Sequence, residues 1–477
     1  MAKLYSSLTD IQIDLKQGTI TVKALVEACL QNIRQYQHLN AFNEVFEQDA
    51  LQQATALDRR LALNETVGRL AGMVISIKDN ICYKDHKVTA SSKILHNFTS
   101  VYSSTIVERL LAEDAIIIGR CNCDEFAMGA TNESSFYGPV KNQADETRVS
   151  GGSSGGSAVS VQARMCHAAI GTDTGGSVRQ PASFCGVIGL KPSYGSISRY
   201  GVIAYASSFD QPGIFSRSIE DAALLLEVLS GADEYDSTLS QQAVPAYSRH
   251  LQYSSAKQKV GYLKEALESE GTDDDVKKAM ADYLNALRAE GHTVEPVSFQ
   301  YLDYIVPAYY ILATAEASSN LARYDGVHYG YRSPEATDLM STYKKSRSEG
   351  FGKEVKRRIM LGTFVLSAGY YDAYYAKAQK IRRLIREETE QLLNQYDFIV
   401  LPTAPEPAFE LRKAERDPVT TYLADIYTVQ ASLAGIPAIS LPAGTGKQNL
   451  PLSVQVLGKR FGEQKLLNFS KYSLKLL

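Results

Sequence analysis

Short apolar runs that end in polar residues or glycine recur along the chain. Four of them are MVISIKDN (73–80), AIIIGR (115–120), CHAAIGTD (166–173) and FIVLP (398–402). Continuous apolar runs of this length are typical of strands that are buried on both faces of a sheet. Strands of this kind fold together with covering helices. The pattern therefore predicts an α/β protein built on a large sheet.

The segments between these runs favour helices. Residues 104–113 and 218–230 carry helical patterns. The second pattern opens with Ser218 and Asp221 in capping-box spacing and stops at Gly231. Both features mark the ends of a helix, so strands and helices alternate along the chain.

A late pair of apolar segments predicts a different kind of pairing. IPAISLPAG (436–444) and LPLSVQVLG (450–458) are separated by a short turn that contains Gly and Asn. Such a turn joins antiparallel neighbours. We therefore expect one large, mixed β-sheet covered by helices.

The N-terminal part of the chain predicts helices rather than strands. The segment 21–33 begins with the capping residue Thr21, and residues 43–63 repeat its helical character. One stripe of the first helix is apolar: Val22, Leu25, Val26, Cys29 and Ile33. We expect residues 1–65 to form a helical segment packed on the core, and residues 66–477 to form one continuous domain.

Composition excludes several classes of protein. The 477 residues are 44% hydrophobic and 22% charged, the usual balance of a globular protein with a large core. The formal net charge is −3, and KEVKRRI (353–359) is only a local basic run. A protein that binds the phosphate backbone of nucleic acid carries a clear excess of basic residues. If nucleic acid is involved, we expect a partner to hold most of it.

The sequence has no signal peptide, no membrane-spanning run and no paired cysteine motif, and these features bear on its cellular compartment. Met1–Asp10 has neither the basic start nor the apolar core of a signal peptide, and no apolar run approaches the roughly 20 residues that span a bilayer. The six cysteines are sparse, and Cys121 and Cys123 do not have the C-x-x-C spacing of metal or redox pairs. We expect a cytoplasmic protein without membrane contact, with buried free thiols and no metal site.

The stretch VSGGSSGGSAVS (149–160) is unusually rich in glycine and serine. A flexible linker is one interpretation, but apolar residues follow at once. A phosphate-binding loop would need a lysine after its last glycine, and none follows Gly155 or Gly156. A third interpretation is a backbone that must pass very close to a site of chemistry.

A second glycine-rich segment, GTDTGGSVRQPASFCG (171–186), directly follows a predicted strand. Ser177 follows Gly175 and Gly176 and precedes an expected helix start. Several backbone N–H groups converge on one point in such a turn, which is the outline of an oxyanion hole. A purely structural turn is the alternative.

A nucleophilic serine needs a base, and the histidines are poorly placed to supply it. None lies in the last 149 residues, and His167 falls inside an apolar strand pattern that is typical of a core histidine. Lysine can act as the base where burial keeps it neutral. Lys78 ends an apolar strand and is a candidate of this kind, and a solvated surface lysine is the alternative.

Lys78, Ser153 and Ser177, separated by 75 and 24 residues in two glycine-rich frames, resemble the amidase signature family. The resemblance implies a Ser–cisSer–Lys triad on a single mixed sheet. Ser177 would be the nucleophile, Ser153 the bridging serine on a cis peptide, and Lys78 the base. The oxyanion would be held by the N–H groups of Thr174, Gly175, Gly176 and Ser177.

Within the family, the chain is similar to the glutaminase subunits of tRNA-dependent amidotransferases. The stretches that carry this similarity are 176–195, SSFDQPG (207–213), SGADEYDST (230–238), 316–332 and 369–382. The similarity implies a heterotrimer with subunits B and C, in which this chain releases ammonia from glutamine. The partner would hold the tRNA, use ATP and Mg²⁺, and convert Glu-tRNA(Gln) to Gln-tRNA(Gln), so that this chain needs no cofactor.

Glutamine carries an α-carboxylate and an α-ammonium, so its pocket needs a cation and an anion. Similarity to the same group of proteins implies Arg358 and Asp425, with Tyr309 as a lining residue. Arg357 is adjacent and could be the cation instead. Exposed ion pairs are the alternative for all these charges.

Two other functions share much of this pattern. A stand-alone amidase acting on small amides would keep the triad but would need neither a charged pocket nor a partner. A scaffold with a decayed site would keep the fold alone, although all three triad residues are present here.

Overall fold

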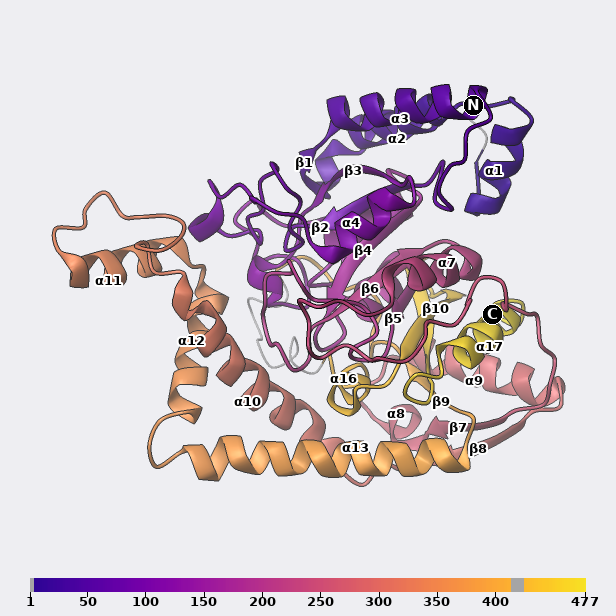
Figure 1. The fold of residues 1–477 in the computed structure, drawn as a ribbon. Coiled ribbons are helices and arrows are strands. Elements are labelled where there is room, and N and C mark those ends of the chain that lie inside the picture. Colours follow the sequence, from indigo (N-terminus) through magenta and orange to yellow (C-terminus); the bar gives the residue numbers. More distant parts are fainter. Residues whose placement is uncertain (1–3, 413–423) are drawn as a thin grey trace.

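The computed structural model describes residues 4–412 and 424–477. In these residues one mixed sheet of 11 strands runs through the protein in the order β1-β3-β2-β4-β6-β5-β10-β11-β9-β7-β8 (Figure 1). The predicted fold class is therefore confirmed. The strands are β1 (Phe42–Val45), β2 (Val74–Lys78), β3 (Ile116–Cys121), β4 (Ala168–Asp173), β5 (Ile188–Lys191), β6 (Gln211–Ser216), β7 (Lys259–Leu263), β8 (Thr293–Val297), β9 (Phe398–Pro402), β10 (Ala438–Thr445) and β11 (Pro451–Leu457).

Parallel and antiparallel pairs both occur in the sheet. Strand β2 pairs in parallel with β3 and β4, whereas β4 pairs antiparallel with β6. The predicted late hairpin is the antiparallel pair β10–β11. Because β2 and β4 are parallel neighbours, their carboxyl ends, at Lys78 and Asp173, meet at one edge of the sheet.

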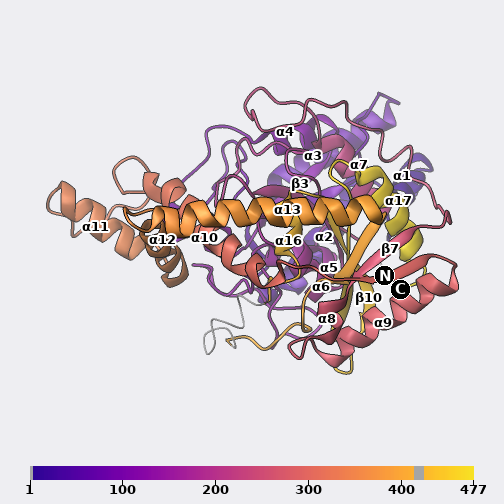
Figure 2. The ribbon, with the colours of Figure 1, turned by 90° about the horizontal axis from the view of Figure 1, so that it is seen from below.

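Helices cover both faces of the sheet, and α10, α12 and α13 form a long flank with α11 beyond it (Figure 1). Seen from below, α13 stretches across the body of the protein (Figure 2). The helices are α1 (Leu8–Lys16), α2 (Val22–Gln35), α3 (Glu47–Ala62), α4 (Thr105–Ala112), α5 (Gly155–Gln162), α6 (Arg179–Cys185), α7 (Ile219–Leu229), α8 (Lys264–Glu268), α9 (Asp274–Ala289), α10 (Leu302–Asn320), α11 (Leu339–Gly350), α12 (Lys353–Val365), α13 (Lys377–Gln395), α16 (Val429–Ala434) and α17 (Glu463–Ser473).

The N-terminal segment differs from its prediction at one point. Helix α2 and its cap at Thr21 are confirmed, since Thr21 Oγ1 accepts a hydrogen bond from Ala24 N. The helix predicted over 43–63 is wrong at its start, because residues 42–45 form β1 and pair antiparallel with β3. The backbone groups there bond to the sheet, which local helical periodicity does not reveal. The division into residues 1–65 and 66–477 stays a prediction.

Helix α7 confirms one half of its predicted capping box. Ser218 Oγ accepts from Asp221 N, and the helix ends before Gly231, whose φ is 117°. The Asp221 carboxylate accepts from Leu8 N at 2.9 Å instead of closing the box. The N-terminal segment is thereby anchored to the body of the protein.

The glycine- and serine-rich stretch is packed into the core. Residues 149–161 are all buried, and α5 begins inside them at Gly155, so the linker interpretation is wrong. A side chain at Gly152 would collide with the Asp124 carboxylate and with Thr131 N. The backbone passes too close to its neighbours for any residue except glycine.

Two further expectations concern cysteines and membranes. All six cysteines are free and buried, as expected. In the part of the chain that the structure describes, no helix has the length and apolar character needed to cross a membrane.

Candidate active site

Lys78 lies at the end of β2 and is fully buried. Its Nζ is 2.7 Å from Ser153 Oγ, 2.9 Å from Ser154 Oγ and 3.1 Å from Thr172 Oγ1. Burial lowers the pKa of Lys78 to about 8, because a charged amine is poorly solvated there. A neutral amine has two N–H donors and one lone pair, which matches three hydroxyl partners.

Ser153 follows a cis peptide bond, Gly152–Ser153, as the family resemblance implies. The residue is fully buried, and its carbonyl oxygen accepts from Asp124 N at 3.1 Å. Its backbone is therefore held while its hydroxyl meets the lysine.

Ser177 lies in the loop between β4 and α6 and is 8% exposed. The N–H of Ser154 donates to the Ser177 carbonyl oxygen at 3.3 Å, so the segments that carry the two predicted serines lie side by side. Among the described residues, Ser177 Oγ makes no hydrogen bond. The fold thus brings the segments of Lys78, Ser153 and Ser177 together.

A buried ion pair holds the loop around Ser177. Asp173 Oδ1 accepts from Gly176 N at 2.8 Å, and Oδ2 accepts from Val178 N at 3.1 Å. The Arg179 guanidinium donates to both oxygens, at 2.8 and 3.0 Å. Burial acts to raise the pKa of Asp173, but Arg179 outweighs it and holds the pKa below its ordinary value. Asp173 therefore stays ionised and fixes the loop.

This contact corrects the predicted oxyanion hole. The Gly176 N–H is already bonded to Asp173, so it is not available to a substrate oxygen. The N–H groups of Thr174, Gly175 and Ser177 have no acceptor within residues 4–412 and 424–477. These three remain as candidate donors.

The two adjacent arginines of α12 have different surroundings. Arg358 is 5% exposed, and its Nη1 donates to Tyr205 Oη at 2.8 Å. Its guanidinium also lies 5.3 Å from the centre of the Tyr310 ring. Both arginines pair with Glu354, Arg358 Nε at 2.9 Å and Arg357 Nη1 at 2.6 Å, but the Arg357 side chain is 42% exposed. Only Arg358 is placed for a buried site.

Asp425 and Arg358 both contact Tyr310. The carboxylate is 9% exposed and accepts from Tyr310 Oη at 3.1 Å. Burial raises its pKa to about 7, against the lowering effects of the Tyr310 hydrogen bond and Arg358. The two predicted charges are therefore buried, so the exposed-pair alternative is wrong for both.

Tyr309 and Asp425 both connect to the Ser177 loop. A Cβ atom on Gly175 would lie 2.5 Å from Tyr309 Cζ, so glycine is needed where the ring meets the loop. Thr428 Oγ1 donates to the Gly175 carbonyl oxygen at 2.6 Å, and Thr428 N donates to the Asp425 carbonyl oxygen at 3.0 Å. The charged residues and the nucleophile loop thus form one site.

The sequence model of the amidase family matches residues 24–467. The chain belongs to the amidase family. It is 49% identical to the A subunit of glutamyl-tRNA(Gln) amidotransferase from Chlorobium phaeobacteroides, over 98% of both chains. It is 50% identical to the protein of that name from Coxiella burnetii, over 97% of this chain and 96% of the relative.

Solved amidase structures share the fold. The A subunit of glutamyl-tRNA(Gln) amidotransferase from Thermotoga maritima is 38% identical with a TM-score of 0.79, over 94% of this chain and 91% of that one. A peptide amidase from Stenotrophomonas maltophilia is 28% identical with a TM-score of 0.84, over 99% of this chain and 97% of that one. The amidase fold therefore extends over nearly the whole chain.

Sequence reasoning missed several polar residues of this amidase site. Ser154 and Thr172 bond to Lys78, Tyr310 bonds to Asp425, and Tyr205 bonds to Arg358. Ser154 and Tyr310 lie beside predicted residues, and Thr172 lies in the glycine-rich segment 171–186, whereas Tyr205 has no such signal. Nothing local distinguishes them from surface hydroxyls.

The predicted interpretation of His167 is confirmed. Its Nδ1 accepts a hydrogen bond from Val74 N at 3.0 Å, and burial together with nearby arginines lowers its pKa to about 3. It is a partly buried, neutral histidine bonded to the backbone of β2, so it supplies no base to the amidase site.

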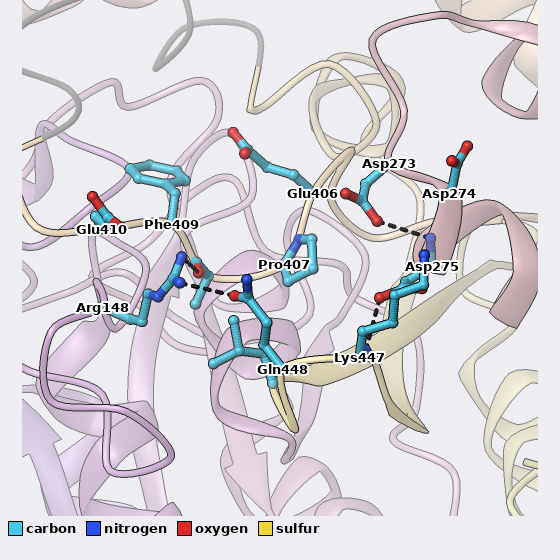
Figure 3. A pocket seen from close by; sticks show the side chains of 13 residues that line it. Arg148, Asp273, Asp274, Asp275, Glu406, Pro407, Phe409, Glu410, Lys447 and Gln448 are labelled. Carbon is cyan, nitrogen blue, oxygen red and sulfur yellow. Dashed lines mark hydrogen bonds and ion pairs between the residues drawn. The ribbon is translucent and has the colours of Figure 1, made fainter.

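A hollow of about 450 Å³ is lined by none of the predicted site residues (Figure 3). Lys447 Nζ lies 3.4 Å from Asp275 Oδ1, and Arg148 donates to Gln448 Oε1 at 2.8 Å. Among the residues that the structure describes, the lining contains neither a serine nor a histidine, and Lys447 is ion-paired. Its lining is Arg148, Asp273, Asp274, Asp275, Glu406, Pro407, Ala408, Phe409, Glu410, Gly446, Lys447, Gln448 and Leu450.

Proposed function

We propose that this chain is the glutamine-hydrolysing A subunit of a glutamyl-tRNA(Gln) amidotransferase. The observation that carries the proposal is the buried pair of opposite charges, Arg358 and Asp425, tied to the loop of Ser177. A free amino acid presents the complementary pair of charges. Relatives that bear this name cover nearly the full chain at 49% and 50% identity.

The reaction begins with proton transfer from Ser177. Ser177 Oγ attacks the side-chain carboxamide carbon of glutamine while its proton passes through Ser153 to neutral Lys78. The N–H groups of Thr174, Gly175 and Ser177 stabilise the oxyanion. The C–N bond then breaks, and the nitrogen leaves as ammonia with the proton returned from Lys78. Water hydrolyses the acyl-enzyme and releases glutamate.

The charged residues orient the substrate. Arg358 binds the α-carboxylate and Asp425 binds the α-ammonium, while Tyr309 lines the pocket beside Gly175. The α-ammonium also favours the ionised form of Asp425, whose pKa of about 7 would otherwise leave it partly protonated at neutral pH. Arg358 and Asp425 together form a glutamine clamp. The clamp therefore selects glutamine over an uncharged amide.

The proposal includes partners that complete the reaction. Subunits B and C form a heterotrimer with this chain, and the ammonia reaches the partner, which uses ATP and Mg²⁺ to amidate Glu-tRNA(Gln). The partner holds most of the tRNA, in agreement with the net charge of −3 of this chain. This chain works in the cytoplasm without a cofactor of its own.

A comparison of substrates tests the proposal against a stand-alone amidase. The purified complex should hydrolyse glutamine with a kcat/KM at least ~100-fold above that for butyramide, because the amide lacks both groups that the clamp binds. Equal use of the two substrates, by a chain that never joins a complex, would favour the stand-alone amidase. A wild-type chain that forms no acyl-enzyme with either substrate would favour the scaffold.

A further inference from the structure

Asp210 occupies a position that links two parts of the site. It directly precedes β6, and Gln211 pairs with Asp173 at the end of β4. The register therefore places Asp210 beside Thr174, the first residue of the nucleophile loop. Thr174 Oγ1 donates to Asp210 Oδ1 at 2.7 Å, and Asp210 is only 5% exposed.

The other oxygen of the same carboxylate holds a different loop. Asp210 Oδ2 accepts from Tyr205 N at 2.9 Å and from Ala206 N at 3.0 Å. Tyr205 is in turn the hydroxyl partner of Arg358, at 2.8 Å. One carboxylate thus contacts the nucleophile loop through one oxygen and the support of the substrate-binding arginine through the other.

The surroundings of Asp210 are those of a fixed structural acid. Its neighbour Phe209 packs edge-on against Tyr309, with ring centres 5.7 Å apart. Burial raises the pKa of Asp210 to about 6, although the Thr174 hydroxyl and two backbone N–H groups favour its ionised form. At neutral pH the carboxylate is an acceptor for all three donors.

We infer that Asp210 is a positioning residue that couples the nucleophile loop to the glutamine clamp. It acts on turnover through Thr174, whose backbone is a candidate oxyanion donor, and on glutamine binding through Tyr205 and Arg358. This inference rests on the proposed function, because it assigns both effects to one substrate.

Three variants of the purified complex separate the effect of Asp210 on turnover, through Thr174, from its effect on glutamine binding, through Tyr205 and Arg358. Thr174→Val, which keeps the shape but removes the hydroxyl, should lower kcat for glutamine about tenfold and leave KM within about twofold. Tyr205→Phe should raise KM about tenfold and leave kcat within about twofold. Asp210→Asn should change both kcat and KM, because it alters the acceptor that binds Thr174 and the backbone of Tyr205. A loss of thermal stability without this division of effects would overturn the inference.

A double-mutant cycle tests the connection itself. Thr174→Val made in the Asp210→Asn background should lower kcat by less than about twofold more, since the hydrogen bond is already disturbed. If the double variant instead loses kcat by the product of the two single-variant factors, the inference is overturned. If Asp210→Asn does not fold, the separate kcat and KM effects of the other two variants still decide.

Asp236 provides a matched control. It is a buried carboxylate, 7% exposed, that accepts from Thr238 Oγ1 at 2.6 Å and from Arg199 N at 2.9 Å. Asp236→Asn should keep kcat and KM within about twofold of the wild type. Equal changes in this control would overturn the assignment to Asp210. A wild-type complex without glutaminase activity would overturn the proposed function as well, whereas an active wild type with an unaltered Asp210→Asn variant would overturn this inference alone.

Discussion

The Nζ of Lys78 lies 2.7 Å from Ser153 Oγ, although 75 residues separate them in the chain. Strand β2 delivers the lysine and the buried Gly/Ser segment delivers the serine. The charged form of Lys78 is disfavoured there because burial removes its hydration. A lysine in this state can accept a proton near neutral pH, and each prediction about turnover depends on that property.

Replacement of Lys78 should remove most of the activity. Lys78→Ala should lower glutaminase kcat by at least ~100-fold, since a general base contributes about 10²–10⁴-fold. Lys78→Arg should be equally inactive, because a guanidinium stays protonated. Steady-state kinetics of the purified complexes, with circular dichroism as the folding check, measure this. A loss of less than about tenfold in a folded variant would rule out the role of base.

The pH profile should reflect the same group. Lys78 must be neutral to accept a proton, and its pKa of about 8 means that the neutral fraction falls as the pH drops below 8. kcat should therefore rise with pH from 6 and level off above about pH 8, with a slope near one on the acid side. Initial rates at saturating glutamine between pH 6 and pH 9.5 provide the test. A flat profile would contradict a lysine base.

The two adjacent arginines form a matched pair of variants. Arg358→Ala should raise KM for glutamine by about 10- to 150-fold, because the α-carboxylate loses a charge-assisted hydrogen bond of about 1.5–3 kcal/mol. Arg357→Ala should leave KM within about twofold, since its side chain is 42% exposed and its ion pair is screened by solvent. Glutamine titrations of both variants measure the difference. The reverse order of effects would move the assignment to Arg357.

The buried pair Asp173–Arg179 should matter for stability as well as for the loop. Asp173→Ala leaves the Arg179 guanidinium buried without its partner, which costs about 3–5 kcal/mol in comparable cases. Denaturant unfolding of the chain should show this loss. Asp282→Ala is the control, because Asp282 pairs with Lys278 at the surface and should leave the unfolding midpoint nearly unchanged. A similar midpoint for both variants would contradict the structural role of Asp173.

The sequence predicted those features that depend on local pattern. Strands such as β2 and β4 are buried on both faces, so their apolar runs are unambiguous, and the glycine frames around Ser153 and Ser177 are specific. β1 was missed because an edge strand of four residues is fixed by pairing with β3 rather than by its own periodicity.

The remaining site residues depend on contacts between distant segments. Arg357 and Arg358 are neighbours on one helix, and only the packing of α12 decides which of them is buried. Tyr205 lies 153 residues from its partner Arg358, and Asp210 lies 36 residues from Thr174. No local pattern reveals such pairs, because a tyrosine or an aspartate in a loop reads as an ordinary surface residue.

The most direct test of the account separates ammonia release from ammonia use. In a purified complex carrying Ser177→Ala, Gln-tRNA(Gln) formation should be abolished with glutamine as the nitrogen donor, because no acyl-enzyme can form. With an ammonium salt and ATP it should continue at a rate close to that of the wild-type complex. Co-purification of the subunits confirms that the variant still assembles. Equal loss with both donors in an assembled complex, or full activity of the variant with glutamine, would contradict the assignment of Ser177 as the nucleophile that releases ammonia.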